Sequence, residues 1–244
     1  MTQGGGRIAL VTGANKGIGL EIARQLGRAG VTVFLGARDI GRGEAAAEAL
    51  RSEGLNSIAL HLDVTDTVVV RNAAVSIETH GGRLDILVNN AGIVDAGDGP
   101  PSGASLAAVR SLFETNFFGA LTVTQVMLPL LRKSSAGRIV NMSSSLGSLA
   151  MNGDASSRYY AVRQIGYNTS KAALNMLTVQ LSEELRDTLI VVNSVCPGYV
   201  DTDLSGHRGI LSPAEAARMP IRLALLGEQQ LSGKFLNVDG EIPW

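Results

Sequence analysis

Short apolar runs rich in β-branched residues alternate along this chain with longer amphipathic stretches, and this alternation constrains the fold most. Strands are expected over Ile8–Val11, Val31–Leu35, Ser57–Leu62, Ile86–Val88, Arg138–Met142, Leu189–Val195 and Lys234–Val238. Helices are expected over Gly17–Arg28, Gly43–Glu53, Thr67–His80, Leu106–Arg132 (as one helix or two), Tyr167–Asp187 and Pro213–Leu225. The pattern predicts an α/β fold, a doubly wound sheet of about seven parallel strands with helices on both faces.

No repeat or linker-like change of composition interrupts the 244 residues, so we expect a single domain over residues 1–244. Three segments do not follow the alternation: residues 93–104, 145–166 and 198–211. Loops of this length in a compact domain usually carry function. Each follows an expected strand, and open α/β sheets bind ligands beyond the carboxyl ends of their strands. These segments are therefore predicted to be substrate loops.

Charge and composition exclude several classes of protein. Lys and Arg number 21 and Asp and Glu 22, so the charge balance favours neither nucleic acid nor an anionic membrane as partner. Cys196 is the one cysteine, which excludes an internal disulfide, and with only three histidines we expect no metal site. The sequence lacks a signal-like apolar segment at its start and any membrane-length apolar run. A cytoplasmic location is expected.

A glycine-rich turn joins the first expected strand to the first expected helix. Gly13, Gly17 and Gly19 have the spacing G-x-x-x-G-x-G, which differs from the more general dinucleotide fingerprint. Glycines at such a junction let backbone N–H groups and the helix N-terminus face a pyrophosphate. A purely structural turn is the alternative. The position at the first strand–helix junction of an alternating chain favours the phosphate site.

Tyr167 and Lys171 are four residues apart on an expected helix and therefore share a face. An ammonium beside a tyrosine favours the phenolate and lowers the tyrosine pKa, which makes the hydroxyl a usable acid or base. A surface pair without function is the alternative. Tyr159 and Tyr160 are competing candidates, but neither is followed by lysine at the fourth position.

Four motifs occur together in an order that resembles the short-chain dehydrogenase/reductase family: Thr12–Gly19, Asn89–Gly92, Tyr167–Lys171 and Cys196–Gly198. The resemblance covers essentially the whole chain. The stretches TGANKGIGLEIARQL and GARDIGRG look most like the carbonyl reductase branch of the family. The resemblance implies a Rossmann-type fold and an NADP(H) cofactor, and members of the family commonly form a homodimer or homotetramer, which we expect here.

The resemblance also implies catalytic roles for Asn116, Ser144, Tyr167 and Lys171. Tyr167 would supply the proton, Ser144 would orient the carbonyl oxygen, and Lys171 would lower the tyrosine pKa while holding the ribose. Asn116 would hold a water in a proton relay to the lysine, although a buried asparagine could equally fix a helix bend. Either neighbour of Ser144 in the three-serine run could take its role instead. Residues 151–166 are interpreted as containing an insertion.

The cofactor contacts implied by the same motifs are Gly13, Asn15, Lys16, Gly17, Ile18, Gly19, Arg38, Asp63, Val64, Asn90, Tyr167, Lys171, Pro197, Val200 and Thr202. Preference for NADP(H) over NAD(H) has a local argument. The second expected strand ends at Ala37 rather than at an acid, and Arg38 follows it. A guanidinium matches a 2′-phosphate, and Lys16 could approach that phosphate from the other side. Arg42 adds a third charge, and Asp39 is expected to begin the next helix.

The sequence therefore predicts NADPH-dependent reduction of a ketone or aldehyde to an alcohol. Two alternatives remain, an NADP-dependent dehydrogenase working mainly towards alcohol oxidation and a non-catalytic NADP(H)-binding protein. A serine hydrolase is set aside because the G-x-S-x-G elbow is missing. The expected partner is a small, apolar carbonyl or alcohol substrate. Its pocket is expected to be lined by Val94, Leu146, Leu149, Met151, Tyr199, Leu204 and Ile210.

Overall fold

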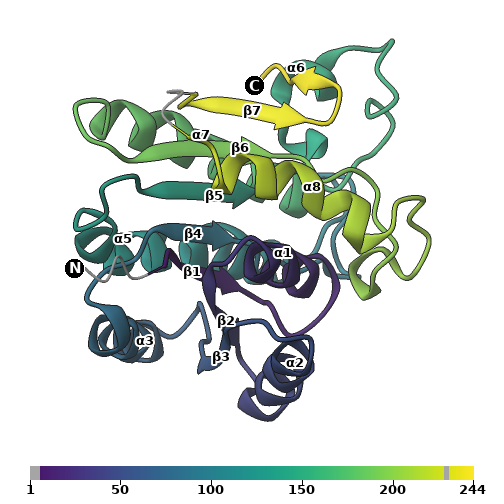
Figure 1. Ribbon diagram of the computed structural model, residues 1–244. Helices are drawn as coiled ribbons and strands as arrows, with labels where there is room; N and C mark the ends of the chain where they lie inside the picture. The colour runs from purple at the N-terminus through teal and green to yellow at the C-terminus, as the bar shows by residue number, and fades with distance from the viewer. Residues whose placement is uncertain (1–5, 228–230) are drawn as a thin grey trace.

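The computed structural model describes residues 6–227 and 231–244, and Figure 1 shows a central sheet with helices packed against it. The expectation about a signal segment concerns residues 1–5 in large part and so lies outside the described residues. Within the described residues, no helix is long and apolar enough to cross a membrane.

All eight described strands belong to one sheet, in the order β3-β2-β1-β4-β5-β6-β7-β8. The strands are β1 (Ile8–Thr12), β2 (Thr32–Ala37), β3 (Ser57–His61), β4 (Ile86–Asn89), β5 (Arg138–Met142), β6 (Val191–Val195), β7 (Lys234–Asn237) and β8 (Gly240–Glu241). The pairs from β3 to β7 are parallel, and β8 pairs antiparallel with β7. This confirms the predicted doubly wound α/β sheet and adds one short edge strand, too brief to leave a pattern in the sequence.

The helices are α1 (Gly17–Arg28), α2 (Ile40–Ser52), α3 (Thr67–Gly81), α4 (Leu106–Phe113), α5 (Ala120–Leu131), α6 (Leu149–Gly153), α7 (Ile165–Glu184) and α8 (Pro213–Ala224). A π-helical turn, η1 (Glu114–Gly119), joins α4 to α5, and two short 3₁₀ turns are η2 (Ser145–Gly147) and η3 (Asp203–Ser205). Helix α2 begins three residues earlier than expected. Asp39 is its N-cap and accepts the backbone N–H of Arg42 at 3.1 Å.

Each face of the sheet has its own apolar core. On one face, α1, α2 and α8 pack residues such as Ile22, Leu50 and Leu223 against the strands. On the other face, α3, α5 and α7 contribute residues such as Ile77 and Met127. The central strands β1, β4, β5 and β6 are buried along their whole length, as strands covered on both faces are.

The strand order fixes where a ligand site can form. From β1 the chain builds the sheet outward to β2 and β3, and then returns to add β4 on the other side of β1. The connections after β1 and β4 therefore diverge and leave a crevice at the carboxyl ends of these strands. The three expected substrate loops follow β4, β5 and β6, so they leave the sheet at this same edge (Figure 1). Within residues 145–166, η2 and α6 form where only loop was expected.

Candidate active site

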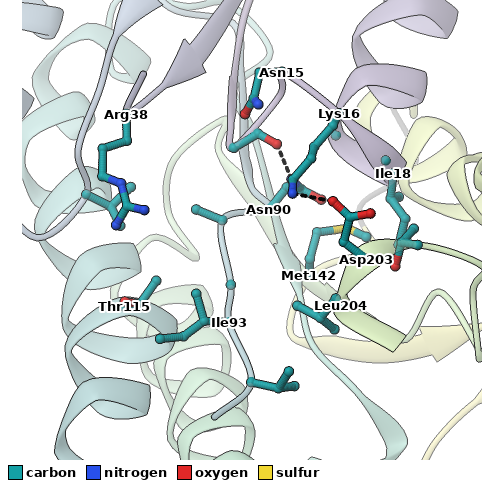
Figure 2. A pocket seen from close by; sticks show the side chains of 18 of the residues that line it. Asn15, Lys16, Ile18, Arg38, Asn90, Ile93, Thr115, Met142, Asp203 and Leu204 are labelled. Atoms are coloured by element: carbon teal, nitrogen blue, oxygen red, sulfur yellow. Dashed lines mark hydrogen bonds and ion pairs between the residues drawn. The ribbon is translucent and has the colours of Figure 1, made fainter. Parts of the chain in front are cut away.

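A cavity of about 1050 Å³ opens at the carboxyl ends of β1, β4 and β5, and Figure 2 shows part of its lining. Most of the predicted site residues line it: Gly13, Asn15, Lys16, Gly17, Ile18, Gly19, Arg38, Asp63, Val64, Asn90, Tyr167, Lys171, Pro197 and Thr202. Three predicted residues do not line it. Asn116 and Val200 are buried, and Ser144 forms a hydrogen bond with Tyr167, which does line the cavity. The structure thus brings four distant motifs to one cavity.

The glycine turn after β1 has a backbone that other residues would strain. Gly13 and Gly17 adopt φ values of 63° and 58°, in the left-handed region that favours glycine. A Cβ added to Gly19 would lie 2.4 Å from Nδ2 of Asn90 and 2.6 Å from the carbonyl oxygen of Gly13. The turn is therefore a close-packed cradle. Glycine is required here by the left-handed backbone and by the close approach of Asn90 and Gly13.

Asn90, at the end of β4, holds this cradle. Its Nδ2 donates to the carbonyl oxygens of Thr12 and Gly13 at 2.8 and 3.2 Å. In return, Oγ1 of Thr12 accepts the backbone N–H groups of Asn90 and Ala91, both at 2.9 Å. These bonds tie the ends of β1 and β4 together where the crevice opens. Asn90 is among the expected cofactor contacts, and these bonds direct its amide nitrogen to the glycine turn.

The N-terminus of α1 points into the same cavity. Lys16 is the N-cap residue, and its side chain makes no capping hydrogen bond to the helix. An uncapped helix N-terminus next to a glycine turn suits a pyrophosphate, since it offers free N–H groups and a positive dipole end. The cradle, the helix end and the cavity volume together fit a dinucleotide.

The Lys16 side chain does not lie free beside this turn. Its ammonium forms an ion pair with Asp203 of η3, across the mouth of the cavity (Figure 2). Asp203 also accepts from His207 at 2.9 Å, and Asp201 bonds the other ring nitrogen at 2.9 Å. The two carboxylates raise the pKa of His207 through these bonds. Sequence reasoning missed Asp203 and His207, since no motif marks them.

Arg38 follows β2 and reaches into the cavity on the side away from Lys16 (Figure 2). It forms no salt bridge within residues 6–227 and 231–244, whereas Arg42 pairs with Asp39 at 3.4 Å. Nearby, burial raises the pKa of Asp63, but hydrogen bonds from Thr65 and the charge of Arg38 outweigh it and lower that pKa below its usual value. Arg38 is therefore the predicted cation best placed to meet an added phosphate.

Tyr167 lies in the first turn of α7 and faces the cavity. Burial and the nearby Cys196 raise the pKa of its hydroxyl to about 12, and a hydrogen bond with Ser144 lowers it only in part. The expectation that the neighbouring ammonium would lower this pKa is wrong for the protein without cofactor, because desolvation of the phenolate dominates. The tyrosine is neutral at physiological pH.

Among the three consecutive serines, Ser144 is the one whose hydroxyl bonds Tyr167. Ser143 turns its hydroxyl to the carbonyl oxygen of Lys171 at 3.4 Å, and Ser145 donates to Sγ of Cys196 at 3.2 Å. Of the three serines, Ser143 lines the cavity, whereas only Ser144 bonds the tyrosine that would donate the proton. The geometry favours the predicted choice over both alternatives.

Lys171 is 5% exposed and has no carboxylate partner within the described residues. Its ammonium donates to the carbonyl oxygen of Met142, at the end of β5, at 2.9 Å. Burial lowers its pKa to about 8. The side chain is thus a desolvated cation directed at the cavity, which favours a charged or polar ligand nearby.

Asn116 sits in the π-helical turn η1 and is 1% exposed. Its Oδ1 accepts the N–H of Ile93 at 2.8 Å, and its Nδ2 donates to the Ile93 carbonyl at 3.1 Å and to Oγ of Ser170 at 3.1 Å. π-Turns inside helices are frequent at functional sites. These bonds join the turn to the loop after β4 and to α7, and both the helix-bend role and the proton relay stay predictions.

The competing tyrosines lie elsewhere. Tyr159 lines a separate cavity of about 340 Å³ and accepts a hydrogen bond from Arg158 at 2.7 Å. Tyr160 is 40% exposed, and the guanidinium of Arg163 lies 4.4 Å from its ring centroid. Neither tyrosine lines the main cavity. Of the expected apolar lining, only Val94 and Leu204 lie there, and Met151 lines the smaller cavity.

The sequence of this chain is similar to those of known proteins. Residues 7–209 match the protein family described as short chain dehydrogenase. (−)-Isopiperitenone reductase from Mentha piperita is 34% identical, and the alignment covers 96% of each chain. Carbonyl reductase (NADPH) 1 from Macaca fascicularis is 35% identical, and the alignment covers 92% of each chain.

A solved structure is similar along nearly its whole length. The NADPH-bound carbonyl reductase from chicken fatty liver superposes with a TM-score of 0.85 at 32% sequence identity. The match covers 98% of this chain and 99% of that one. The likeness therefore extends to the substrate-side segments as well as to the sheet.

Proposed function

This chain belongs to the short-chain dehydrogenase family, and from that premise we propose that it is a carbonyl reductase that uses NADPH. It is an oxidoreductase acting on carbonyl or alcohol groups, as its relatives are named reductases and dehydrogenases. The proposal goes further in naming the direction, the cofactor preference and the residues. Each of these rests on the cavity described above.

The observation that carries the proposal is the hydrogen bond between Ser144 and Tyr167, whose side chain lines the cavity. Two neighbouring hydroxyls can both donate to one carbonyl oxygen when the donor of their mutual hydrogen bond turns to the substrate, and together they hold and polarise that oxygen. Bound NADPH would supply the hydride for the carbonyl carbon. Tyr167 would then release its proton to the oxygen while Ser144 keeps that oxygen in place.

The raised pKa of Tyr167 keeps its hydroxyl in the form that donates a proton during reduction. At about 12 the hydroxyl is protonated at neutral pH, which is the form that a proton donor needs. The acceptor is an alkoxide, the conjugate base of an alcohol whose pKa is close to the ~15.7 of water. Proton transfer from a tyrosine of pKa about 12 to such an alkoxide is downhill. Alcohol oxidation would instead need the phenolate, which is scarce at this pKa.

Lys171 would support the charge that the tyrosine acquires. Its pKa of about 8 keeps most of the side chain cationic at neutral pH, despite burial. A cation on the same face of α7 stabilises the developing phenolate more than the neutral tyrosine, so its effect is largest during proton transfer. We propose that the same ammonium also binds a ribose hydroxyl of the cofactor.

Three features support NADP(H) as the cofactor. The glycine cradle and the N-terminus of α1 fit a pyrophosphate. Arg38 stands at the end of β2, where a 2′-phosphate would need a guanidinium, and Ala37 provides no acid for a free ribose 2′-hydroxyl. The similar chicken protein was solved with NADPH bound, and the macaque relative is named for NADPH.

The proposed substrate is an apolar ketone or aldehyde. Ile93, Val94, Met142 and Leu204 lie around the cavity beyond the cradle, and the relative from Mentha piperita is named for isopiperitenone. The test is to mix the protein with NADPH and a panel of aliphatic, aromatic and terpenoid carbonyl compounds while following NADPH absorbance. The proposal expects turnover of at least one apolar compound. Failure to oxidise NADPH with any of these carbonyl compounds would contradict it.

A further inference from the structure

The helix that carries Tyr167 is capped from outside its own sequence. Gln164, at the N-cap position of α7, makes no capping hydrogen bond with its side chain. The carboxylate of Asp98 takes its place. Its two oxygens accept the backbone N–H groups of Gly166 and Tyr167, each at 2.8 Å. The carbonyl oxygen of Gly99 accepts the N–H of Ile165 at 2.9 Å. The first turn is thus held by two residues of a remote loop.

That loop is the connection after β4, one of the three expected substrate loops. Asp98 lies 69 positions before Tyr167, so the contact joins segments that are distant in the chain. Between β4 and Asp98 the same loop passes Val94, which lines the main cavity. A negative charge at a helix N-terminus is favourable, since it meets unpaired N–H groups and the positive end of the dipole.

The other end of this loop is held by Asn116. Both backbone polar groups of Ile93 bond the Asn116 side chain, at 2.8 and 3.1 Å. Asn116 also donates to Oγ of Ser170, and that hydroxyl donates to the carbonyl oxygen of Tyr167 at 2.8 Å. The backbone of Tyr167 is therefore fixed on both sides, at its N–H by Asp98 and at its carbonyl by Ser170.

The first turn of α7 is restricted on one side by close packing and along its axis by the bonds to Asp98. A Cβ added to Gly166 would lie 2.7 Å from Cδ1 of Leu112 and 3.2 Å from Cα of Val109, so α7 presses directly on α4. The helix start cannot move towards α4. Movement along the helix axis, or fraying of the first turn, is opposed by the carboxylate bonds.

We propose that Asp98 is a positioning residue, which caps the tyrosine helix from the substrate loop and holds the Tyr167 hydroxyl in register with Ser144. This inference rests on the proposed function, because it assumes that Tyr167 delivers the proton. Within the described residues, the Asp98 carboxylate bonds only backbone N–H groups, including that of Gly99 at 2.9 Å. It does not line the cavity and has no bond to the tyrosine hydroxyl within the described residues, so its effect must pass through the helix.

Three variants test the role: Asp98→Ala, Asp98→Asn and the matched control Asp95→Ala. Asp95 lies in the same loop, but its carboxylate accepts only the N–H of Gly97, at 2.8 Å. The first measurement is amide hydrogen exchange of residues 165–167 in the cofactor-free protein. Loss of a cap is expected to speed this exchange about fivefold to tenfold in Asp98→Ala, and Asp95→Ala should match the unmodified protein.

The second measurement is steady-state kinetics, with kcat expressed per NADPH-binding site so that unfolded protein does not count. Asp98→Ala should lower kcat about 10- to 100-fold, the cost of misplacing a catalytic group, while KM for NADPH stays within about twofold. Asp98→Asn keeps one oxygen acceptor and should recover part of the loss. A merely structural role would leave kcat per site unchanged.

Unchanged exchange at residues 165–167 in Asp98→Ala would overturn the cap. Faster exchange with unaltered kcat, or an equal loss of kcat in Asp95→Ala, would overturn the positioning role. If the unmodified protein reduces no carbonyl compound, the proposed function fails and the catalytic role of Asp98 fails with it. The exchange result then still decides whether Asp98 caps the helix, so the two failures are distinguishable.

Discussion

The ammonium nitrogen of Lys171 lies 5.7 Å from the ring centroid of Tyr167, one turn further along α7. A cation at this distance from an aromatic ring is attracted by the ring's negative face. Within the described residues, the buried ammonium contacts this ring and the carbonyl oxygen of Met142, and it pairs with no carboxylate. Burial of the Lys171 ammonium beside Tyr167 therefore costs desolvation free energy, as is common for groups at catalytic sites.

That cost predicts a pH-dependent stability. The pKa of Lys171 falls from 10.5 to about 8 on folding, so between these values the unfolded chain binds the proton and the folded protein does not. Stability of the unmodified protein should rise with pH across this window. Lys171→Met, which lacks the buried charge, should be the more stable protein below pH 8.

The comparison is made by urea unfolding of both proteins from pH 7 to 10.5. With each pKa unit worth about 1.4 kcal/mol, the advantage of Lys171→Met should shrink by about 3 kcal/mol between pH 8 and 10.5. Tyr167 is present in both proteins, so its raised pKa cancels in the difference. A difference that stays constant with pH would refute the lowered lysine pKa.

Cofactor preference should depend on Arg38 more than on the other two cations predicted near the 2′-phosphate. Lys16 is paired with Asp203 and Arg42 with Asp39, whereas Arg38 faces the cavity. Arg38→Ala should raise KM for NADPH at least tenfold and leave KM for NADH nearly unchanged, because one charge-assisted contact is lost. Arg42→Ala is the control and should change KM for NADPH by less. Equal kcat/KM for NADPH and NADH in the unmodified protein would rule out the preference.

The glycine cradle makes a separate prediction. In Gly19→Ala the new methyl group would collide with Asn90 and with the backbone of Gly13, so the turn must open. NADPH affinity, measured by fluorescence titration, should fall at least tenfold, which corresponds to about 1.4 kcal/mol. Gly153→Ala is the control, since a Cβ there meets nothing within 4 Å. Unchanged affinity in Gly19→Ala would mean that the cradle does not hold the cofactor.

The fold and most of the cavity were predictable because their determinants are local. Buried parallel strands are apolar runs, and the glycine turn and the Tyr167–Lys171 spacing can be recognised within a few residues. The predicted strand over Arg138–Met142 and helix over Gly17–Arg28 match the structure to the residue. Asp39 is the N-cap of α2, in line with the resemblance, although the helix itself starts at Ile40 and not at the expected Gly43.

What the sequence did not reveal depends on contacts between distant segments. Helix α7 begins two residues before the predicted start because Asp98 and Gly99 accept its first N–H groups, and no motif links them. The π-turn around Asn116 arises where the helix meets Ile93. The raised pKa of Tyr167 follows from burial, which spacing alone does not reveal. The Lys16–Asp203 pair likewise joins two loops.

Assembly remains a prediction from the resemblance. Phe118 on η1 and Met176 on α7 are 45% and 56% exposed in the single chain, on elements that carry Asn116 and Tyr167. Light scattering at working concentration should give two or four times the chain mass of 25.5 kDa. A mass equal to one chain would contradict the predicted homodimer or homotetramer.

The central claim is that Tyr167, and neither Tyr159 nor Tyr160, supplies the proton for carbonyl reduction. The most direct test is kcat of the three Tyr→Phe variants with NADPH and the best carbonyl substrate, alongside NADPH affinity. Tyr167→Phe should lose about 10²- to 10⁴-fold in kcat with nearly intact NADPH binding, because one proton donor is removed. Tyr159→Phe and Tyr160→Phe should retain kcat, since neither side chain lines the main cavity. Full activity in Tyr167→Phe, or loss in either of the others, would contradict the account.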